Sequence, residues 1–492
     1  MQITVNRKSL KFLPDSSRVI ARYFFTTDER AINVILMVLH LSDEEVRTAL
    51  TKVLRDYSLR HRNITKIFEK HFNNISHLFA PLNIRTENLD YSRKILIGSY
   101  FTMEYSVDAA AFFNPCIVEH PDQTQVGKDE TRVILSFRAT GEGHISSIVF
   151  RTGVLDRYSN LTIEPVGNML EEPELIRRHI YEKKAFKKQL EEIRKKHIEF
   201  KPEQILEKLN DTFNYDELHM VLEEVRKTTY RTHETDKLLD KVNLLGSSNY
   251  ELEFSMDVHL SERVIFPVSQ NERHGIEDAR FVKFMDESGK AMYYATYTAF
   301  NGISTVPKML ETDYFYHFNV MPISGDLAKN KGMALFPRKV NGRYVMLSRL
   351  DGCNNYLAYS DKISYWHEAK LLQQPRFPWE FVQIGNCGSP IETEAGWLVI
   401  THGVGTMREY AIGASLFDLQ DPEKEIGRLE YPIIVPNAEE REGYVPNVVY
   451  SCGCMIHNND LILPYAMADY ASTYATINVQ ELLNELKNSC RP

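Results

Sequence analysis

Paired apolar runs separated by a short polar turn recur along the second half of the chain at a nearly constant interval. Each unit places a turn rich in Gly, Asn or Asp between two strand-like runs, which is the pattern of a β-hairpin. The turns fall at residues 287–289, 341–342, 394–396 and 458–460, so successive turns are roughly 53, 54 and 64 residues apart. This interval is typical of the four-stranded blades of a β-propeller.

A similar unit lies earlier in the chain, with apolar runs at 112–118 and 132–138, about three intervals before the next one. The stretch between them, about 171–245, has charged runs and apolar residues at helical spacing. Removing this stretch leaves room for one ordinary interval. We therefore predict a mainly β protein whose residues 96–492 form a five-bladed β-propeller with a helical insertion. A β-sandwich, or a helical domain followed by an unrelated β-domain, is the alternative.

Residues 1–95 are predicted to form a mainly helical region. Ser42 and Glu45 have the spacing of a capping box, and apolar residues follow at helical intervals. The apolar run at 31–41 is far shorter than the roughly 20 residues that a membrane span needs, so we interpret it as a core helix. Residues 1–20 mix charged and apolar side chains without the apolar core of a signal peptide, and we expect a cytoplasmic protein.

The composition favours a small-molecule partner. The 492 residues include 58 Lys and Arg against 67 Asp and Glu, so the net charge of −9 gives no bulk attraction to nucleic acid or to a membrane surface. Six scattered cysteines do not form a disulfide framework. The pair Cys452 and Cys454 lacks the second cluster that a zinc site needs, so we predict buried thiols and no metal.

Polar side chains that interrupt the apolar strands are the candidates for chemistry. Residues 275–280, Gly-Ile-Glu-Asp-Ala-Arg, set two carboxylates and an arginine immediately before the strand at 281–284, although a salt-bridged loop would look the same. Asn114, Arg138, Arg349 and His402 end or follow apolar runs at blade spacing, which would aim them at one channel mouth. Phosphate-loop, zinc-protease and serine-hydrolase signatures are absent from the sequence. These groups suit acid-assisted cleavage of a polar substrate beside a bound anion.

The order and spacing of several short motifs resemble one enzyme family. The motifs are Phe113-Asn114-Pro115, Arg138-Ala139, residues 275–280, Ala334 to Lys339, Ser348-Arg349, residues 388–397, Thr401-His402-Gly403 and Tyr465 to Asp469. In this the chain is similar to glycoside hydrolase family 130, the five-bladed propeller enzymes that comprise mannoside phosphorylases and related β-mannosidases. The resemblance looks strongest to the longer 1,2-β-oligomannan phosphorylase type.

The resemblance implies a role for each motif residue. Asp278 matches the acid that donates a proton to the glycosidic oxygen. Arg349, His402 and Tyr410 match a phosphate site. Two further positions of that site differ from the shorter phosphorylases: Lys331 stands where they have an Arg-Asn pair, and Gln383 stands where they have a lysine. The residues that match sugar contacts are Asn114, Arg138, Glu277, Arg280 and Asp469.

The activity that the resemblance implies is that of an inverting phosphorylase that cleaves a β-mannoside and releases α-mannose 1-phosphate. The 1,2-linkage is the one that the resemblance favours. Inorganic phosphate would be the co-substrate, and no cofactor or metal is expected. An exo-β-1,2-mannosidase, a propeller that binds glycans without catalysis, and a nucleotide-sugar-dependent glycosyltransferase remain alternatives. We expect the two helical regions to pack on the propeller flank or to contact a further subunit, and to help wall the acceptor subsites.

Overall fold

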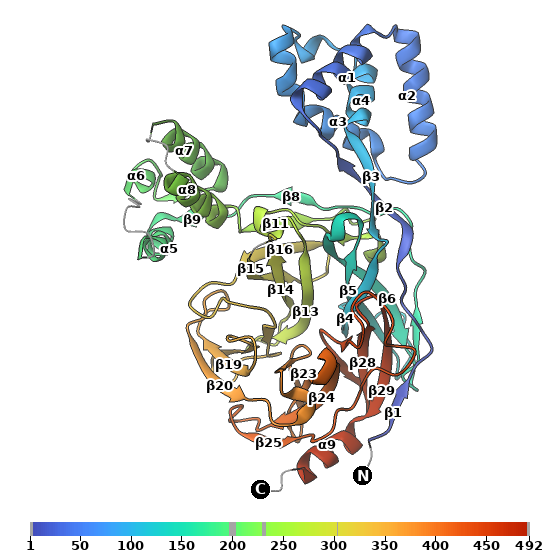
Figure 1. The fold of residues 1–492 in the computed structure, drawn as a ribbon, viewed down its shortest axis with the longest axis vertical. Coiled ribbons are helices and arrows are strands. Elements are labelled where there is room, and N and C mark those ends of the chain that lie inside the picture. Colours follow the sequence, from blue (N-terminus) through green and yellow to red (C-terminus); the bar gives the residue numbers. More distant parts are fainter. Residues whose placement is uncertain (1–2, 196–202, 229–232, 303, 490–492) are drawn as a thin grey trace.

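The structure is a computed structural model that describes residues 3–195, 203–228, 233–302 and 304–489. It is mainly β, with helices grouped at the outside of the strands (Figure 1). Cys490, one of the six cysteines, lies outside the described residues.

Antiparallel sheets succeed one another along the described chain, and we number five of them in that order. The first sheet contains β4 (Ala111–Glu119), β5 (Thr131–Thr140), β6 (Ser146–Leu155), β12 (Val264–Ile265) and β7 (Leu161–Ile163). The second contains β13 (Ile276–Met285), β14 (Ala291–Phe300), β15 (Thr305–Thr312), β16 (His317–Pro322), β11 (Tyr250–Glu253) and β8 (Glu174–Ile176). The hairpins predicted around the turns at 287–289, 394–396 and 458–460 are confirmed.

The remaining three sheets follow the same plan. The third contains β17 (Ala334–Leu335), β18 (Tyr344–Ser348), β19 (Asn355–Ser360) and β20 (Glu368–Gln373). The fourth contains β21 (Gln383–Asn386), β22 (Ile391–Thr393), β23 (Gly396–Val404), β24 (Tyr410–Phe417) and β25 (Glu425–Arg428). The fifth contains β26 (Val449–Tyr450), β27 (Met455–His457), β28 (Asp460–Met467), β29 (Ala471–Asn478) and β1 (Val5–Arg7).

Each sheet contacts the next, and the fifth contacts the first, so the sheets lie around a common centre (Figure 1). The contacts bury apolar side chains between neighbouring sheets. Phe150 of the first sheet, for example, packs edge-on against Phe281 of the second, with ring centroids 5.9 Å apart. Such aromatic and aliphatic layers are the hydrophobic core, since each strand turns one face toward each neighbouring sheet.

Strand β1 closes the fifth sheet by pairing with β29, with Val5 opposite Ile477. The segment 1–95, expected to be mainly helical, therefore contributes a strand to the β region. The pairing joins residues that are far apart in the sequence, and three residues carry too short a pattern to reveal it.

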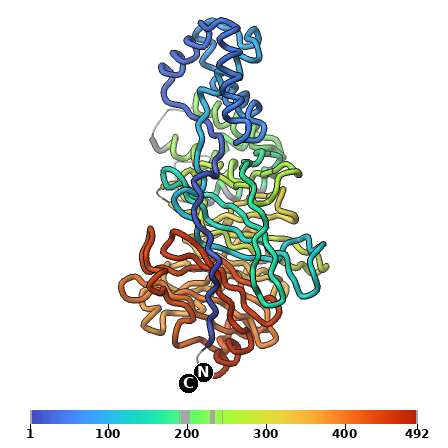
Figure 2. The backbone as a smooth tube through the Cα atoms, turned by 90° about the vertical axis from the view of Figure 1, so that its right-hand side faces the viewer, coloured from blue at the N-terminus to red at the C-terminus, as the bar shows by residue number. Residues whose placement is uncertain are grey.

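The N-terminal helices stand away from the sheets on a two-stranded ladder of β2 (Asp15–Tyr23) and β3 (Thr102–Asp108) (Figure 2). They are α1 (Asp28–His40), α2 (Asp43–Tyr57), α3 (Ile64–Asn74) and α4 (Tyr91–Tyr100). The capping box predicted for Ser42 and Glu45 is confirmed at the start of α2. The strand predicted to begin near residue 96 begins only at Thr102, because α4 continues to Tyr100. The prediction placed the boundary too early because the residues there are apolar, which fits a helix as well as a strand.

A second group of helices interrupts the second sheet between β8 and β11. It contains α5 (Lys183–Lys195), α6 (Glu203–Leu206), α7 (Tyr215–Thr228) and α8 (His233–Gly246), with the short strands β9 (Tyr181–Glu182) and β10 (Thr212–Phe213). The expectation of helix from residue 171 is wrong for 171–182, because residues 174–176 pair with β11 as an edge strand. A last helix, α9 (Val479–Asn488), follows β29. No helix within the described ranges has both the length and the apolar character needed to cross a bilayer.

Candidate active site

The Gly-Ile-Glu-Asp-Ala-Arg motif begins at Gly275, and its other five residues are the start of β13. The prediction that the whole motif lies just before the strand is therefore wrong. The pairing of β13 with β14 shifts between Glu277 and Arg280, which leaves Asp278 and Ala279 out of register. Asp278 adopts a left-handed conformation, with φ of 57°. Such an irregularity re-aims a side chain that regular pleating would direct into a sheet contact. It turns the Asp278 carboxylate into the site while the strand continues past it.

Asn114 occupies the corresponding position in β4, the neighbouring strand of the first sheet. Its φ is 50°, and the register with β5 shifts between Phe113 and Cys116. The Asn114 amide Nδ2 donates a 2.7 Å hydrogen bond to Asp278 Oδ1. The Asn114 Oδ1 atom is buried and has no hydrogen-bond partner in the described structure. Two matching strand irregularities thus bring an amide and a carboxylate together, and leave a free acceptor beside them.

Cationic groups surround this pair. Arg138 of β5 donates from Nη2 to Glu277 Oε1 at 2.8 Å, and its Nη1 lies 3.5 Å from Asp278 Oδ1. Lys331 Nζ contacts the other oxygen of Glu277, at 2.5 Å. Glu277 therefore holds Arg138 and Lys331, and both of these cations act on the Asp278 carboxylate. Lys331, predicted from the family resemblance to serve the phosphate, is ion-paired to a carboxylate in this structure.

Burial works to raise the pKa of the Asp278 carboxyl, but Arg138, Arg280 and Lys331 outweigh it, so that the pKa lies below its usual value. In the unliganded protein Asp278 is therefore ionised near neutral pH. A bound dianion would offset part of the surrounding positive charge and make protonation of Asp278 easier.

A second carboxylate, Asp469, lies just beyond the end of β28 and also has a positive φ, 51°. Burial, followed by the nearby charge of Asp278, raises the pKa of Asp469 to about 6, although Arg138 and Arg408 act in the opposite direction. The two aspartates therefore have pKa values shifted in opposite directions. Environments that separate two carboxyl groups in this way are common where one of them handles a proton.

Arg280 connects the carboxylate cluster to a second group of polar residues. Its Nη1 donates to the Asp278 main-chain carbonyl at 2.9 Å, and its Nη2 donates to Tyr450 Oη at 2.7 Å. The Tyr450 ring packs edge-on against the His402 ring, with centroids 4.9 Å apart. Tyr450 was not among the predicted residues, because a tyrosine in a short apolar strand carries no distinguishing signal.

The second group centres on His402, which lies within β23 and is buried. Its Nδ1 lies 3.1 Å from the Asn386 main-chain carbonyl, which can only accept, so Nδ1 carries the proton. Its Nε2 faces two donors, Arg349 Nη1 at 3.3 Å and Gln383 Nε2 at 3.2 Å. Burial, Arg349 and Arg280 lower the pKa of His402 well below its usual value, so the ring is neutral.

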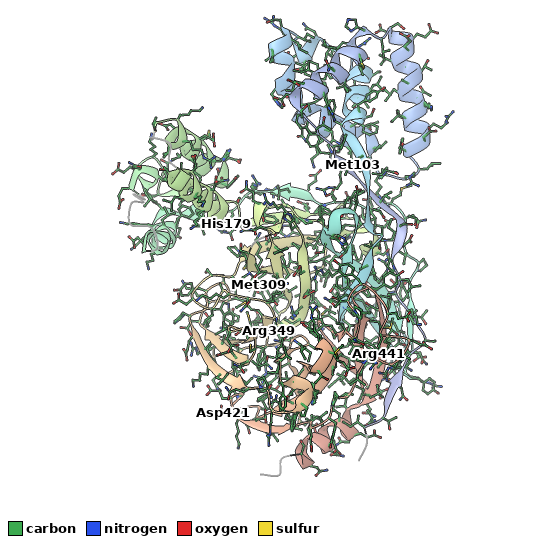
Figure 3. The ribbon with its side chains drawn as sticks, viewed as in Figure 1. Met103, His179, Met309, Arg349, Asp421 and Arg441 are labelled. Atoms are coloured by element: carbon green, nitrogen blue, oxygen red, sulfur yellow. The ribbon has the colours of Figure 1, made fainter. Side chains whose placement is uncertain are left out.

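Arg349 follows β18 and lies near the middle of the sheets (Figure 3). Its buried Nε has no hydrogen-bond partner in the described structure, which leaves a donor for a ligand. Tyr410 lies parallel to the His402 ring, with centroids 6.0 Å apart. A free guanidinium donor beside a neutral histidine fits an oxyanion such as phosphate.

The predicted residues therefore come together as two connected groups. The first holds Asn114, Arg138, Glu277, Asp278, Lys331 and Asp469, and the second holds Arg349, Gln383, His402 and Tyr410, with Arg280 between them. The buried thiols of Cys116, Cys387 and Cys452 lie near Arg280, and burial raises their pKa values above the ordinary range, so they stay protonated. Within the described residues, no cluster of three or more His, Cys, Asp or Glu side chains could bind a metal ion.

An acid, an anion site and free polar groups for hydroxyls, set at the centre of antiparallel sheets, are the attributes of an enzyme that acts on a glycoside. Comparison with known proteins agrees. The chain belongs to glycoside hydrolase family 130, whose sequence model, described as beta-1,4-mannooligosaccharide phosphorylase, matches residues 179–488. It is thus an enzyme of the glycoside phosphorylase class, and the family predicted from the motifs is confirmed.

Several curated relatives match between 32% and 50% of the chain. A 1,2-beta-oligomannan phosphorylase of Thermoanaerobacter sp. strain X514 is 33% identical over 46% of this chain and 75% of its own length. A beta-1,2-mannobiose phosphorylase of the same organism is 34% identical over 50% of this chain and 82% of its own length. The solved structure of the Listeria innocua beta-1,2-mannobiose phosphorylase, with bound mannobiose, covers 78% of this chain and 93% of its own, at 23% identity and a TM-score of 0.46.

Proposed function

We propose that the protein is an inverting phosphorylase of β-1,2-linked mannosides that releases α-mannose 1-phosphate. One observation carries this proposal above the others. The Asp278 carboxylate and the unpartnered donor of Arg349 belong to two separate groups that Arg280 connects. An inverting phosphorylase needs this arrangement, because the acid and the attacking anion act on opposite faces of one sugar.

In the proposed reaction, hydrogen phosphate bound by Arg349, Gln383 and His402 attacks the anomeric carbon through one oxygen. The bond from that carbon to the glycosidic oxygen breaks, and protonated Asp278 supplies the proton that the leaving oxygen takes up. The proton of the attacking hydrogen phosphate then restores the acid, so no protein base is required. Phosphate itself helps to protonate Asp278, since its charge offsets that of Arg280 and Lys331.

The sugar whose anomeric carbon is attacked would lie over the carboxylate cluster. The unpartnered Asn114 Oδ1 and the carboxylate of Asp469 are acceptors for hydroxyl groups, and Arg138 is a donor. Preference for mannose and for the 1,2-linkage is inferred from the names of the relatives in the Thermoanaerobacter strain.

We further propose that the five sheets are the blades of a β-propeller, closed by β1, and that residues 96–492 are its catalytic domain with a helical insertion at about 171–245. Cyclic contact between the sheets supports this architecture. A cytoplasmic location fits a reaction that consumes inorganic phosphate and yields a charged sugar. The helical regions would serve contacts between identical subunits.

The test is to incubate the enzyme with β-1,2-mannobiose and β-1,2-mannotriose, with and without inorganic phosphate, and to separate mannose 1-phosphate from free mannose. Phosphate-dependent formation of mannose 1-phosphate is the expected result. Free mannose regardless of phosphate would instead make the protein a β-mannosidase, and the absence of both products would favour a glycan-binding role.

A further inference from the structure

Two turns stand at the same end of the sheets as the site, and each follows a strand that carries a site residue. The turn Glu142–His144 comes after Arg138 of β5, and the turn Thr406–Arg408 comes after His402 of β23. Each contains two consecutive residues with positive φ, between 54° and 66°. These turns therefore form part of the rim above the carboxylate and anion groups.

The segment 441–448 lies on this rim against the end of β28. Val445 N donates to the Ala468 carbonyl at 2.9 Å, directly before Asp469. A Cβ atom placed on Gly443 would lie 2.7 Å from Ala468 Cβ, so the segment packs closely on the backbone that positions Asp469. Tyr444 is thus fixed a short distance from the site by its own neighbours in the chain.

Tyr444 and His144 stack on each other across the rim, between the fifth and the first sheet. Their ring centroids are 5.4 Å apart and their planes differ by 30°. Both side chains are exposed, Tyr444 by 66%. The pair joins two loops and leaves aromatic ring surface open to solvent, and an aromatic ring offers a large, rigid contact area to a ligand.

The chemistry of inversion fixes the direction in which the leaving group departs. Arg349, which directly follows β18 of the third sheet, and His402, in β23 of the fourth sheet, would hold the phosphate. The leaving group lies opposite the attacking phosphate, and this is the side of the first sheet, where Asn114 holds Asp278. On the inner side, Arg280 and the nearby thiols of Cys387 and Cys452 are buried beside the Asp278 main chain, so we expect the rest of the substrate to extend toward the exposed rim.

We infer that the stacked pair of His144 and Tyr444 is the binding platform for the acceptor portion of the substrate, the sugars beyond the scissile bond. Their open ring surfaces offer a flat apolar contact to the C–H face of a pyranose ring. This inference rests on the proposed function and deepens it, because it assigns chain-length preference to two residues outside the proposed catalytic groups. Longer oligosaccharides gain from the platform, and monosaccharides do not.

The test measures binding without turnover. In an Asp278→Asn background, the dissociation constant for β-1,2-mannotriose is measured by calorimetry before and after adding Tyr444→Ala or His144→Asn. Asparagine is chosen at 144 because it tolerates the positive φ there. Each change is expected to weaken trisaccharide binding about three- to tenfold, the range of one aromatic contact, while phosphate binding stays within about twofold.

Two further variants sharpen the result. Tyr444→Phe keeps the ring and should retain the trisaccharide affinity. Tyr158→Ala removes a tyrosine of matched exposure, 63%, from the turn at the other end of β6, and should change nothing.

Unchanged affinity in Tyr444→Ala and His144→Asn, an equal loss in Tyr158→Ala or Tyr444→Phe, or no trisaccharide binding by the Asp278→Asn parent would each overturn the inference. Failure of the proposed function would appear in another measurement, as absence of mannose 1-phosphate from the wild-type enzyme.

Discussion

Asn114 and Asp278 occupy equivalent irregularities in neighbouring strands, with φ of 50° and 57°, and are joined by a 2.7 Å hydrogen bond from amide to carboxylate. The bond ties the first sheet to the second at the position where the acid is needed. Asparagine and aspartate tolerate left-handed backbone better than other residues with a Cβ, so the same residue types that serve the chemistry also permit the geometry.

Replacing Asp278 with Asn should abolish phosphorolysis without unfolding the protein. The Asn side chain has the same shape, tolerates the positive φ, and can still accept from Asn114, but it cannot donate the required proton. Loss of a general acid lowers kcat by about 10²- to 10⁴-fold. The measurement is the rate of mannose 1-phosphate release, with the thermal unfolding midpoint as a check on folding. Asp286→Asn, in an exposed turn, is the matched control, and wild-type rates in Asp278→Asn would contradict the assignment.

Replacing Gly385 with Ala should damage the anion site selectively. Gly385 is paired with His402, and a Cβ there would lie 2.2 Å from His402 Cε1, so the ring must move away from Arg349 and Gln383. We expect KM for phosphate to rise about tenfold or more, while KM for the oligosaccharide changes little. Overpacking should also cost about 1–3 kcal/mol of stability. Gly127→Ala, where the added atom meets only the flexible Glu130 side chain, is the control. An unchanged KM for phosphate would show that His402 does not take part in anion binding.

Replacing Gln383 with Lys should strengthen phosphate binding. The amide already faces His402 Nε2 at 3.2 Å, and an ammonium group there would add a positive charge beside the Arg349 donor. KM for phosphate is expected to fall severalfold at low ionic strength and to approach the wild-type value as salt is added, since screening weakens the new charge. Gln420→Lys adds the same charge at an exposed position after β24. Equal effects from both variants would mean that only the overall charge had acted.

Replacing Asp469 with Asn should stabilise the protein at neutral pH while lowering its activity. The pKa of Asp469 is about 6 in the folded protein and near 3.9 in an unfolded chain. Folding therefore takes up a proton between these values, and the free energy of unfolding falls as pH rises from about 4 to about 6. Asn does not titrate, and it tolerates the positive φ. The difference in unfolding midpoint, variant minus wild type, should thus be larger at pH 7.5 than at pH 4, by about 1 to 3 °C. An equal difference at both pH values would show that Asp469 is not protonated on folding.

Local patterns explain which elements could be predicted from the sequence. The hairpin at 287–289 was visible because strand alternation and a turn rich in small polar residues occur within one short window. The capping box of Ser42 and Glu45 was visible for the same reason. The pairing of β1 with β29 could not be predicted, because the local pattern of three residues does not indicate a partner strand at the other end of the chain.

The candidate site shows the same division. Family motifs identified Asp278, His402 and Arg349, and the structure brings them into connected groups. The motifs could not reveal that Lys331 pairs with Glu277, because that contact depends on the packing of the second sheet against the third. Nor could they reveal the positive φ of Asn114 and Asp278, since a strand pattern in sequence does not show where the register will shift.

The β1–β29 pairing also sets the order in which the molecule can be completed. A ribosome releases β1 first and β29 last, so the fifth sheet must wait for almost the whole chain before it can form. Closing so long a loop is slow. Until it closes, the remaining sheets must stay together without the completed fifth sheet. Once formed, the same pairing protects both strands, because neither β1 nor β29 can detach without exposing the strand edge of the other. The fifth sheet should therefore form late in folding, and the folded protein should unfold slowly.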